Sequence, residues 1–363
     1  MSLSKEVEPL LQEEPGRHTI LPLRYPVVWK WYKTIEGLLW PAQDAVLSID
    51  TLHWKNVLTP GDRAFYKPIF GVFGPGDEKI TENLDKFLSQ FKVKEMKYFY
   101  DIQAVNEHAH SEAYSLQITA IFPEQEQEEL FNSIETMPIV GKLMGWVDKW
   151  IASTEPIGTC MVAFAFFEGG IFQGLFMAIQ LLKERNVMPG VTMLNELISR
   201  DEGVHCKAAC EILKAYIVNR PSKERVHQIM QEAIELFDEL IDGACNDARE
   251  AMGLPPSAPC PVKMVTEKDM KQYARFIFDK VAEDLGYSPL YQVKNPYPES
   301  VKLSLNSVLK TNFFENLVTQ YSAEIDYSFA ATLKNVQLTS LGKPRQGAAS
   351  LVKCSASLLR MAA

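Results

Sequence analysis

The sequence has little of what marks secreted, nucleic-acid-binding or β-rich proteins. Lys and Arg number 37 against 46 Asp and Glu, and the formal net charge of −9 argues against nucleic acid as a partner. The six cysteines form no C-x-x-C pair, so a structural zinc site is disfavoured. The first residues are charged throughout and do not resemble a signal peptide. We therefore expect an intracellular, cytoplasmic protein with reduced thiols.

One apolar stretch, residues 157–182, is long enough to span a bilayer. It carries Glu168, a Gly-Gly pair and Gln173 near its middle. A charged group at the centre of a bilayer is costly. The stretch therefore predicts a buried core helix, and no membrane partner is expected.

Helical periodicity dominates the chain, and no alternating strand pattern competes with it. The sequence predicts an all-α protein with an N-terminal arm and short helix over 1–40, a helical domain over 41–321 and a flexible tail over 322–363. Apolar residues recur at helical spacing in five segments: 84–121, 157–185, 191–217, 224–252 and 266–285. Turn residues such as "FGPGD" at 73–77 separate the helices.

Histidine is scarce, with six in the chain. Three of them follow a glutamate by three positions, which places each pair on one helix face: Glu107/His110, Glu202/His205 and Glu224/His227. His227 lies on the polar side of its helix and is interpreted as solvated. Glu202 and His205 instead interrupt an apolar stripe. His108 points about 200° away from His110 and is expected at the surface or behind the site.

Glu168 lies among phenylalanines, where a lone carboxylate is costly unless it is protonated, paired or bound to a metal. A shared explanation for Glu168 and two Glu-x-x-His pairs is a dinuclear metal site inside a helical bundle. Such a site needs one more carboxylate on a fourth helix. Asp77, which we expect to open a helix, is the best candidate. The four acidic groups would neutralise two divalent ions.

With these residues in view, the chain resembles the small subunit of class I ribonucleotide reductase of the eukaryotic type. The resemblance covers about Glu8 to Tyr321. It rests on a set of short stretches: "EPLL" (8–11), "NEHAHSEAYSL" (106–116), "VAFAFFEG" (162–169), "NELISRDEGVHC" (195–206), "MKQY" (270–273) and "KTNFFE" (310–315).

The resemblance implies a ferritin-like helical bundle with additional helices. It implies two iron ions, with manganese an alternative at one position, held by Asp77, Glu107, His110, Glu168, Glu202 and His205. It also implies that the metals react with dioxygen to form a radical at Tyr114. Transfer of that radical would use Trp40, Asp201 and Tyr321. The implied partners are a large subunit, which reduces ribonucleotides to deoxyribonucleotides, and a second small subunit in a homodimer or heterodimer.

Two departures keep other functions open. The sequence after Trp40, "PAQDAV", has fewer acidic residues than the family usually shows, and residues 342–363 contain no acidic residue. These departures favour a divergent auxiliary subunit that assembles with an active paralogue, whereas the intact ligand set and Tyr114 favour a radical generator. An iron store, an oxidase or a metal-free scaffold fits the sequence less well.

Overall fold

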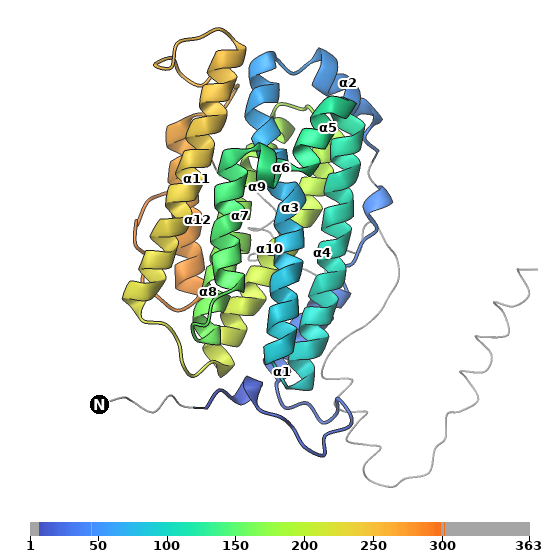
Figure 1. The fold of residues 1–363 in the computed structure, drawn as a ribbon, viewed down its shortest axis with the longest axis vertical. Helices are drawn as coiled ribbons and strands as arrows, with labels where there is room; N and C mark the ends of the chain where they lie inside the picture. The colour runs from blue at the N-terminus through green and yellow to red at the C-terminus, as the bar shows by residue number, and fades with distance from the viewer. Residues whose placement is uncertain (1–6, 45, 299–300, 302–363) are drawn as a thin grey trace, which may run out of the picture. The chain divides into compact units, whose positions relative to one another are not determined.

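The computed structural model describes residues 7–44, 46–298 and 301, and these residues contain helices but no strand. The long helices lie side by side in a bundle (Figure 1). The elements are η1 (Pro9–Leu11), α1 (Pro26–Glu36), η2 (Ala42–Asp44), α2 (Ser48–Asn56), α3 (Pro60–Gln90), α4 (Lys94–Ile121), α5 (Glu124–Phe131), α6 (Ser133–Thr136), α7 (Pro138–Ile151), α8 (Ile157–Phe166), η3 (Phe167–Phe172), α9 (Gln173–Glu184), α10 (Pro189–Tyr216), α11 (Lys223–Ala251) and α12 (Glu267–Asp284).

A continuous rod made of α8, η3 and α9 forms the centre of the bundle. Every residue from 157 to 182 is buried, and α10, α11 and α12 all pack against this rod. Within the described residues, Ile157–Glu184 is the one helical segment long and apolar enough to cross a membrane, and its apolar window is completely buried in the protein. The prediction of a core helix is therefore confirmed.

Helix α3 corrects one prediction. We expected a break at "FGPGD" with Asp77 opening a helix, but α3 runs unbroken through Pro68 and Pro75, and Asp77 lies in its interior. Pro75 has no N–H to give to the carbonyl of Gly71, four residues earlier. The hydroxyl of Ser133 donates to that carbonyl instead, at 2.7 Å. A contact from α6 thus lets the helix continue past a residue that would usually end it.

Helical periodicity located the later helices closely and the earlier ones poorly. The predicted segment 84–121 is two helices, because α3 ends at Gln90 and α4 begins at Lys94. Helices α2, α5, α6 and α7 and the first half of α3 were not predicted. The short helix predicted in the N-terminal arm is α1. The arm before it is tied to the bundle by Arg17, whose guanidinium pairs with the buried carboxylate of Glu95 at 2.6 Å. The predicted tail lies outside the described residues.

Ser133→Ala should lower the free energy of unfolding by about 1–3 kcal/mol, because it leaves the buried Gly71 carbonyl without its donor. In a Pro75→Ala background the cost should be smaller, since alanine at that position restores the backbone N–H. Denaturant unfolding of both single variants and the double variant measures this coupling. Equal costs in the two backgrounds would show that Ser133 does not replace the missing donor.

Candidate metal centre

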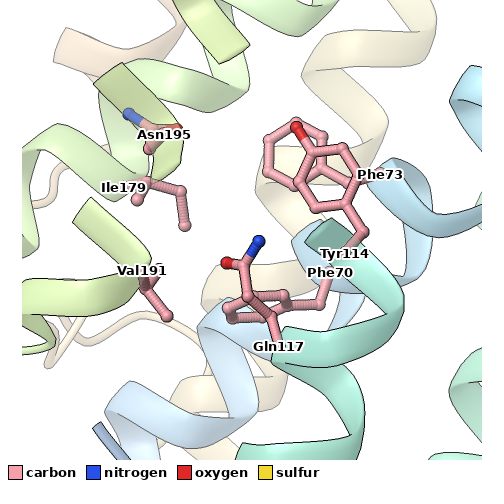
Figure 2. A pocket seen from close by; sticks show the side chains of 7 residues that line it. All are labelled: Phe70, Phe73, Tyr114, Gln117, Ile179, Val191 and Asn195. Carbon is pink, nitrogen blue, oxygen red and sulfur yellow. The ribbon is translucent and has the colours of Figure 1, made fainter. Parts of the chain in front are cut away.

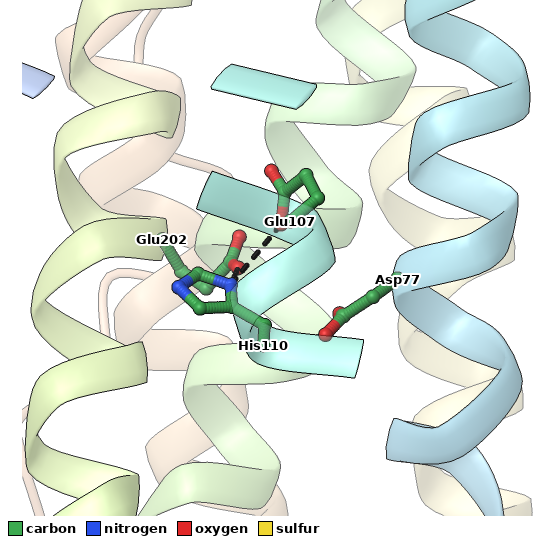
Figure 3. A group of neighbouring side chains, drawn as sticks. All are labelled: Asp77, Glu107, His110 and Glu202. Atoms are coloured by element: carbon green, nitrogen blue, oxygen red, sulfur yellow. Dashed lines mark hydrogen bonds and ion pairs between the residues drawn. The ribbon is translucent and has the colours of Figure 1, made fainter. Parts of the chain in front are cut away.

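The structure brings the six predicted ligands together inside the bundle. They come from four elements: Asp77 from α3, Glu107 and His110 from α4, Glu168 from η3, and Glu202 and His205 from α10. All six side chains are buried. Figure 3 shows four of them converging, and ligand atoms of Asp77, Glu107, His110 and Glu202 lie within 4.8 Å of one another.

Both imidazoles turn Nδ1 toward the same two carboxylates. His110 Nδ1 lies 3.1 Å from Glu107 Oε2 and 2.9 Å from Glu202 Oε1. His205 Nδ1 lies 3.0 Å from Glu107 Oε1 and 3.7 Å from Glu202 Oε2. Glu107 and Glu202 therefore each offer one oxygen toward each histidine. This arrangement suits two cations that share a pair of carboxylates.

Asp77 and Glu168 complete the acidic set. Neither carboxylate oxygen of Asp77 has a hydrogen-bond partner among the described residues. Glu168 Oε1 accepts one hydrogen bond, from Gln103 Nε2 at 3.1 Å. Burial raises the pKa of Asp77 and that of Glu168 well above their ordinary values. Buried oxygens without partners fit a site for hard cations, and four carboxylates balance the charge of two divalent ions.

The pKa values of the two histidines are also raised, which in an imidazole favours the charged form. Although burial disfavours the charged imidazole, the hydrogen bonds of Asp201 and Glu107 raise the pKa of His110 well above its ordinary value. Burial likewise opposes the charge on His205, and Glu107 outweighs it, so the pKa of His205 is also raised. Metal binding at Nδ1 must displace these protons, and metal affinity should therefore fall at low pH.

The π-helix η3 sets the position of Glu168. It spans Phe167–Phe172 and includes Gly169 and Gly170. A Cβ on Gly169 would lie 2.2 Å from Cys206 Sγ on α10, and one on Gly170 would lie 2.6 Å from the ring of Phe278 on α12. Both glycines thus permit close packing with neighbouring helices. π-Bulges are frequent at functional sites because they redirect one side chain without ending the helix.

Tyr114 lies on the same face of α4 as Glu107 and His110 and is 3% exposed. Its hydroxyl has no hydrogen-bond partner among the described residues. Its ring stacks on Phe73 with centroids 5.0 Å apart. Burial, followed by the charge of Asp77, raises the pKa of Tyr114 well above its ordinary value, so the phenol keeps its proton at neutral pH.

A cavity of about 10 Å³ adjoins Tyr114 (Figure 2). That volume accommodates about one water molecule. Aromatic and aliphatic side chains make up most of its wall, and Gln117 and Asn195 supply the amides. The surroundings of Tyr114 are therefore mostly apolar and nearly dry.

Trp40 and Asp201 lie directly behind His110. Trp40 Nε1 donates to Asp201 Oδ2 at 2.7 Å, and His110 Nε2 lies 3.3 Å from the same oxygen. The Trp40 ring also stacks near the His110 ring, with centroids 5.9 Å apart. Burial favours the neutral acid, but the hydrogen bond of His110 and the charge of Arg200 keep the pKa of Asp201 below its ordinary value. Asp201 therefore links a half-buried indole to the metal centre.

The remaining predicted residues lie elsewhere. His227 is on α11, where its Nε2 lies 2.9 Å from the Ser288 carbonyl oxygen, away from the acidic cluster. His108 is exposed. Tyr321 lies outside the described residues. Sequence reasoning missed Gln103 and Asn106, which are both buried beside the centre. Their spacing before Glu107 and His110 on one face of α4 was the available signal.

Comparison with known proteins decides the family. The sequence model described as "Ribonucleotide reductase, small chain" matches residues 17–296. The chain belongs to the ribonucleotide reductase small-chain family. It is 42% identical over 318 residues to a ribonucleoside-diphosphate reductase small chain of African swine fever virus, covering 87% of this chain and 94% of the viral one. It is 40% identical over 321 residues to human ribonucleoside-diphosphate reductase subunit M2, covering 87% and 78% of the two chains.

Solved structures show the same ferritin-like bundle. The Rnr4 homodimer of Saccharomyces cerevisiae aligns with a TM-score of 0.69 at 24% identity, over 83% of this chain and 92% of that one. Dimanganese(II)-NrdF of Streptococcus sanguinis aligns with a TM-score of 0.61 at 16% identity, over 75% and 92%. The expected all-α, ferritin-like fold is confirmed, and the chain is a ribonucleoside-diphosphate reductase small chain with a candidate metal site.

Asp77→Asn should stabilise the metal-free protein at pH 7 by about 1–3 kcal/mol, because it removes a buried acid without a hydrogen-bond partner. The raised folded-state pKa means that Asp77 costs stability as the pH rises above its unfolded value of about 3.9. The gain should therefore vanish below that pH. Denaturant unfolding across pH measures it.

Asp62→Asn is the matched control. Asp62 is also buried, but its carboxylate pairs with Arg185 at 2.7 Å and caps α3. This substitution should destabilise the protein at pH 7. If Asp77→Asn destabilises the protein to the same extent, Asp77 has a partner that the structure does not show.

Proposed function

We propose that this chain generates the tyrosyl radical of a class I ribonucleotide reductase. In this proposal, two metal ions bind to Asp77, Glu107, His110, Glu168, Glu202 and His205, and the radical forms on Tyr114. One observation carries the proposal: two buried imidazoles face the same two carboxylates, one turn from a buried tyrosine without a hydrogen-bond partner. Membership of the family and the shared bundle fold support it.

Each part of the site has a defined task. Two bound ferrous ions would supply two of the four electrons that reduce dioxygen to water, Tyr114 would supply a third, and an external one-electron reductant would supply the fourth. A phenol that loses an electron becomes strongly acidic, so Tyr114 would release its proton together with the electron. Phe73, stacked on Tyr114 and in turn on Phe176, covers one face of the Tyr114 ring. A radical in these surroundings meets few groups that could reduce it.

The route to the protein surface uses the hydrogen bonds behind His110. Asp201 accepts from Trp40 Nε1, and the same oxygen meets His110 Nε2. An electron moving from the half-buried Trp40 toward the centre therefore crosses two hydrogen bonds, and Asp201 orients both rings. Tyr321 would extend this route toward the large subunit, where the ribonucleotide is reduced.

The metals and partners follow from the same chemistry. Carboxylates with two imidazoles accept iron or manganese, and the Streptococcus sanguinis neighbour is a dimanganese protein. We propose iron, with manganese an alternative at one position. The yeast neighbour is a homodimer, and we propose that this chain also pairs with itself or with another small subunit. Its functional partner is the large subunit.

After anaerobic loading with Fe²⁺ and exposure to air, the protein should contain two iron ions per chain and give a tyrosyl EPR signal. Tyr114→Phe should keep the iron and lose the signal. His205→Ala should reduce the bound iron, whereas His227→Ala should not. Metal analysis and EPR of the same samples measure these outcomes. Two irons without a radical would contradict radical generation and favour an auxiliary subunit.

Trp40→Phe should leave the iron content and the Tyr114 EPR signal close to wild type, because Trp40 contacts Asp201 and not the carboxylates of the centre. Reduction of ribonucleotides with the large subunit should fall by at least about a hundredfold, or 2.7 kcal/mol at 1.36 kcal/mol per tenfold. Activity assays with both subunits test this. Wild-type activity in this variant would remove Trp40 from the transfer route.

A further inference from the structure

Asn106 lies between Asp201, which contacts His110, and the second histidine, His205. It is 1% exposed and directly precedes Glu107 on α4. Its Nδ2 lies 3.2 Å from Asp201 Oδ2, and its Oδ1 lies 3.0 Å from His205 Nε2. One carboxamide thus contacts both the acid behind His110 and the second histidine.

The direction of these hydrogen bonds follows from Asp201. An ionised carboxylate only accepts hydrogen bonds, so the Asn106 amide must turn Nδ2 toward it. Oδ1 then faces His205, and Nε2 of His205 must carry the proton that it donates. The same oxygen of Asp201 requires Nε2 of His110 to be a donor. In the neutral imidazoles both Nδ1 atoms are left with a lone pair, and both face Glu107 and Glu202.

We propose that Asn106 is a positioning residue that fixes the His205 tautomer and joins both histidines to Asp201 in one hydrogen-bonded chain. The inference rests on the proposed dinuclear centre and adds to it a residue that binds no metal itself. Asp201 fixes His110 directly, whereas His205 has Asn106 as its Nε2 partner. Without Asn106, the imidazole of His205 loses the contact that holds Nδ1 toward the metal. The carboxamide is suited to this place because it offers one donor and one acceptor.

The test is a titration of the full-length, metal-free chain with Mn²⁺, with free Mn²⁺ quantified by EPR. The wild-type chain should bind two ions. Asn106→Leu replaces the carboxamide with a side chain of similar size that has no polar atom. It should lower the affinity for one of the two Mn²⁺ ions by about 10–100-fold. Asn106→Asp keeps a side-chain oxygen in reach of His205 Nε2, and it should bind both ions more tightly than Asn106→Leu. Gln180→Ala removes a buried amide that contacts Glu184 instead, and it should bind two ions normally.

The contrast separates positioning from packing. If Asn106 serves only packing, Asn106→Leu binds both ions as tightly as wild type, and the proposal is overturned. If Asn106→Leu does not fold, Asn106→Ala replaces it: weak binding in the alanine variant with recovery in the aspartate variant supports the proposal, and equal affinity in the two contradicts it. A wild-type chain that binds fewer than two Mn²⁺ would instead refute the dinuclear centre itself.

Discussion

Four buried carboxylates in the middle of a helical bundle are the constraint on which this structure depends. Asp77, Glu107, Glu168 and Glu202 are all buried, and two of them have oxygens without hydrogen-bond partners. In an apolar core such groups oppose folding unless a counter-charge joins them. The two imidazoles supply part of this positive charge when they are protonated. Two divalent ions can supply all of it. These groups therefore cost stability in the absence of a counter-charge, and the surrounding core has to offset that cost.

Close packing around the four carboxylates holds the elements that carry them in place. The central rod is buried along its whole length from residue 157 to 182 and interrupts its α-helical geometry only where it carries Glu168. Glycines at 169 and 170 let α10 and α12 approach the π-helix. Gly76, beside Asp77, meets the ring of Phe172 in the same way. Close contact between elements fixes the carboxylates on different helices relative to one another.

Further hydrogen bonds orient the two histidines from the side away from the carboxylates. Asp201 joins Trp40, His110 and Asn106 through one oxygen, and Asn106 extends the connection to His205. Outer contacts of this kind set which nitrogen of a histidine faces a metal. In this chain they also connect the candidate metal site to the half-buried Trp40. The same atoms therefore fix the orientation of His110, His205 and Trp40 relative to one another.

The sequence by itself determined the helical class, the central core helix and the six residues that the structure gathers, because helical spacing and misplaced polar residues are local signals. It did not determine that α3 continues through Pro75, because the hydroxyl that replaces the missing donor belongs to Ser133 on another helix. Nor did it single out Gln103 or Asn106, because their spacing before Glu107 and His110 becomes informative only once their hydrogen-bond partners are known. Only the tertiary structure decided these features, because each depends on atoms brought together from distant parts of the chain.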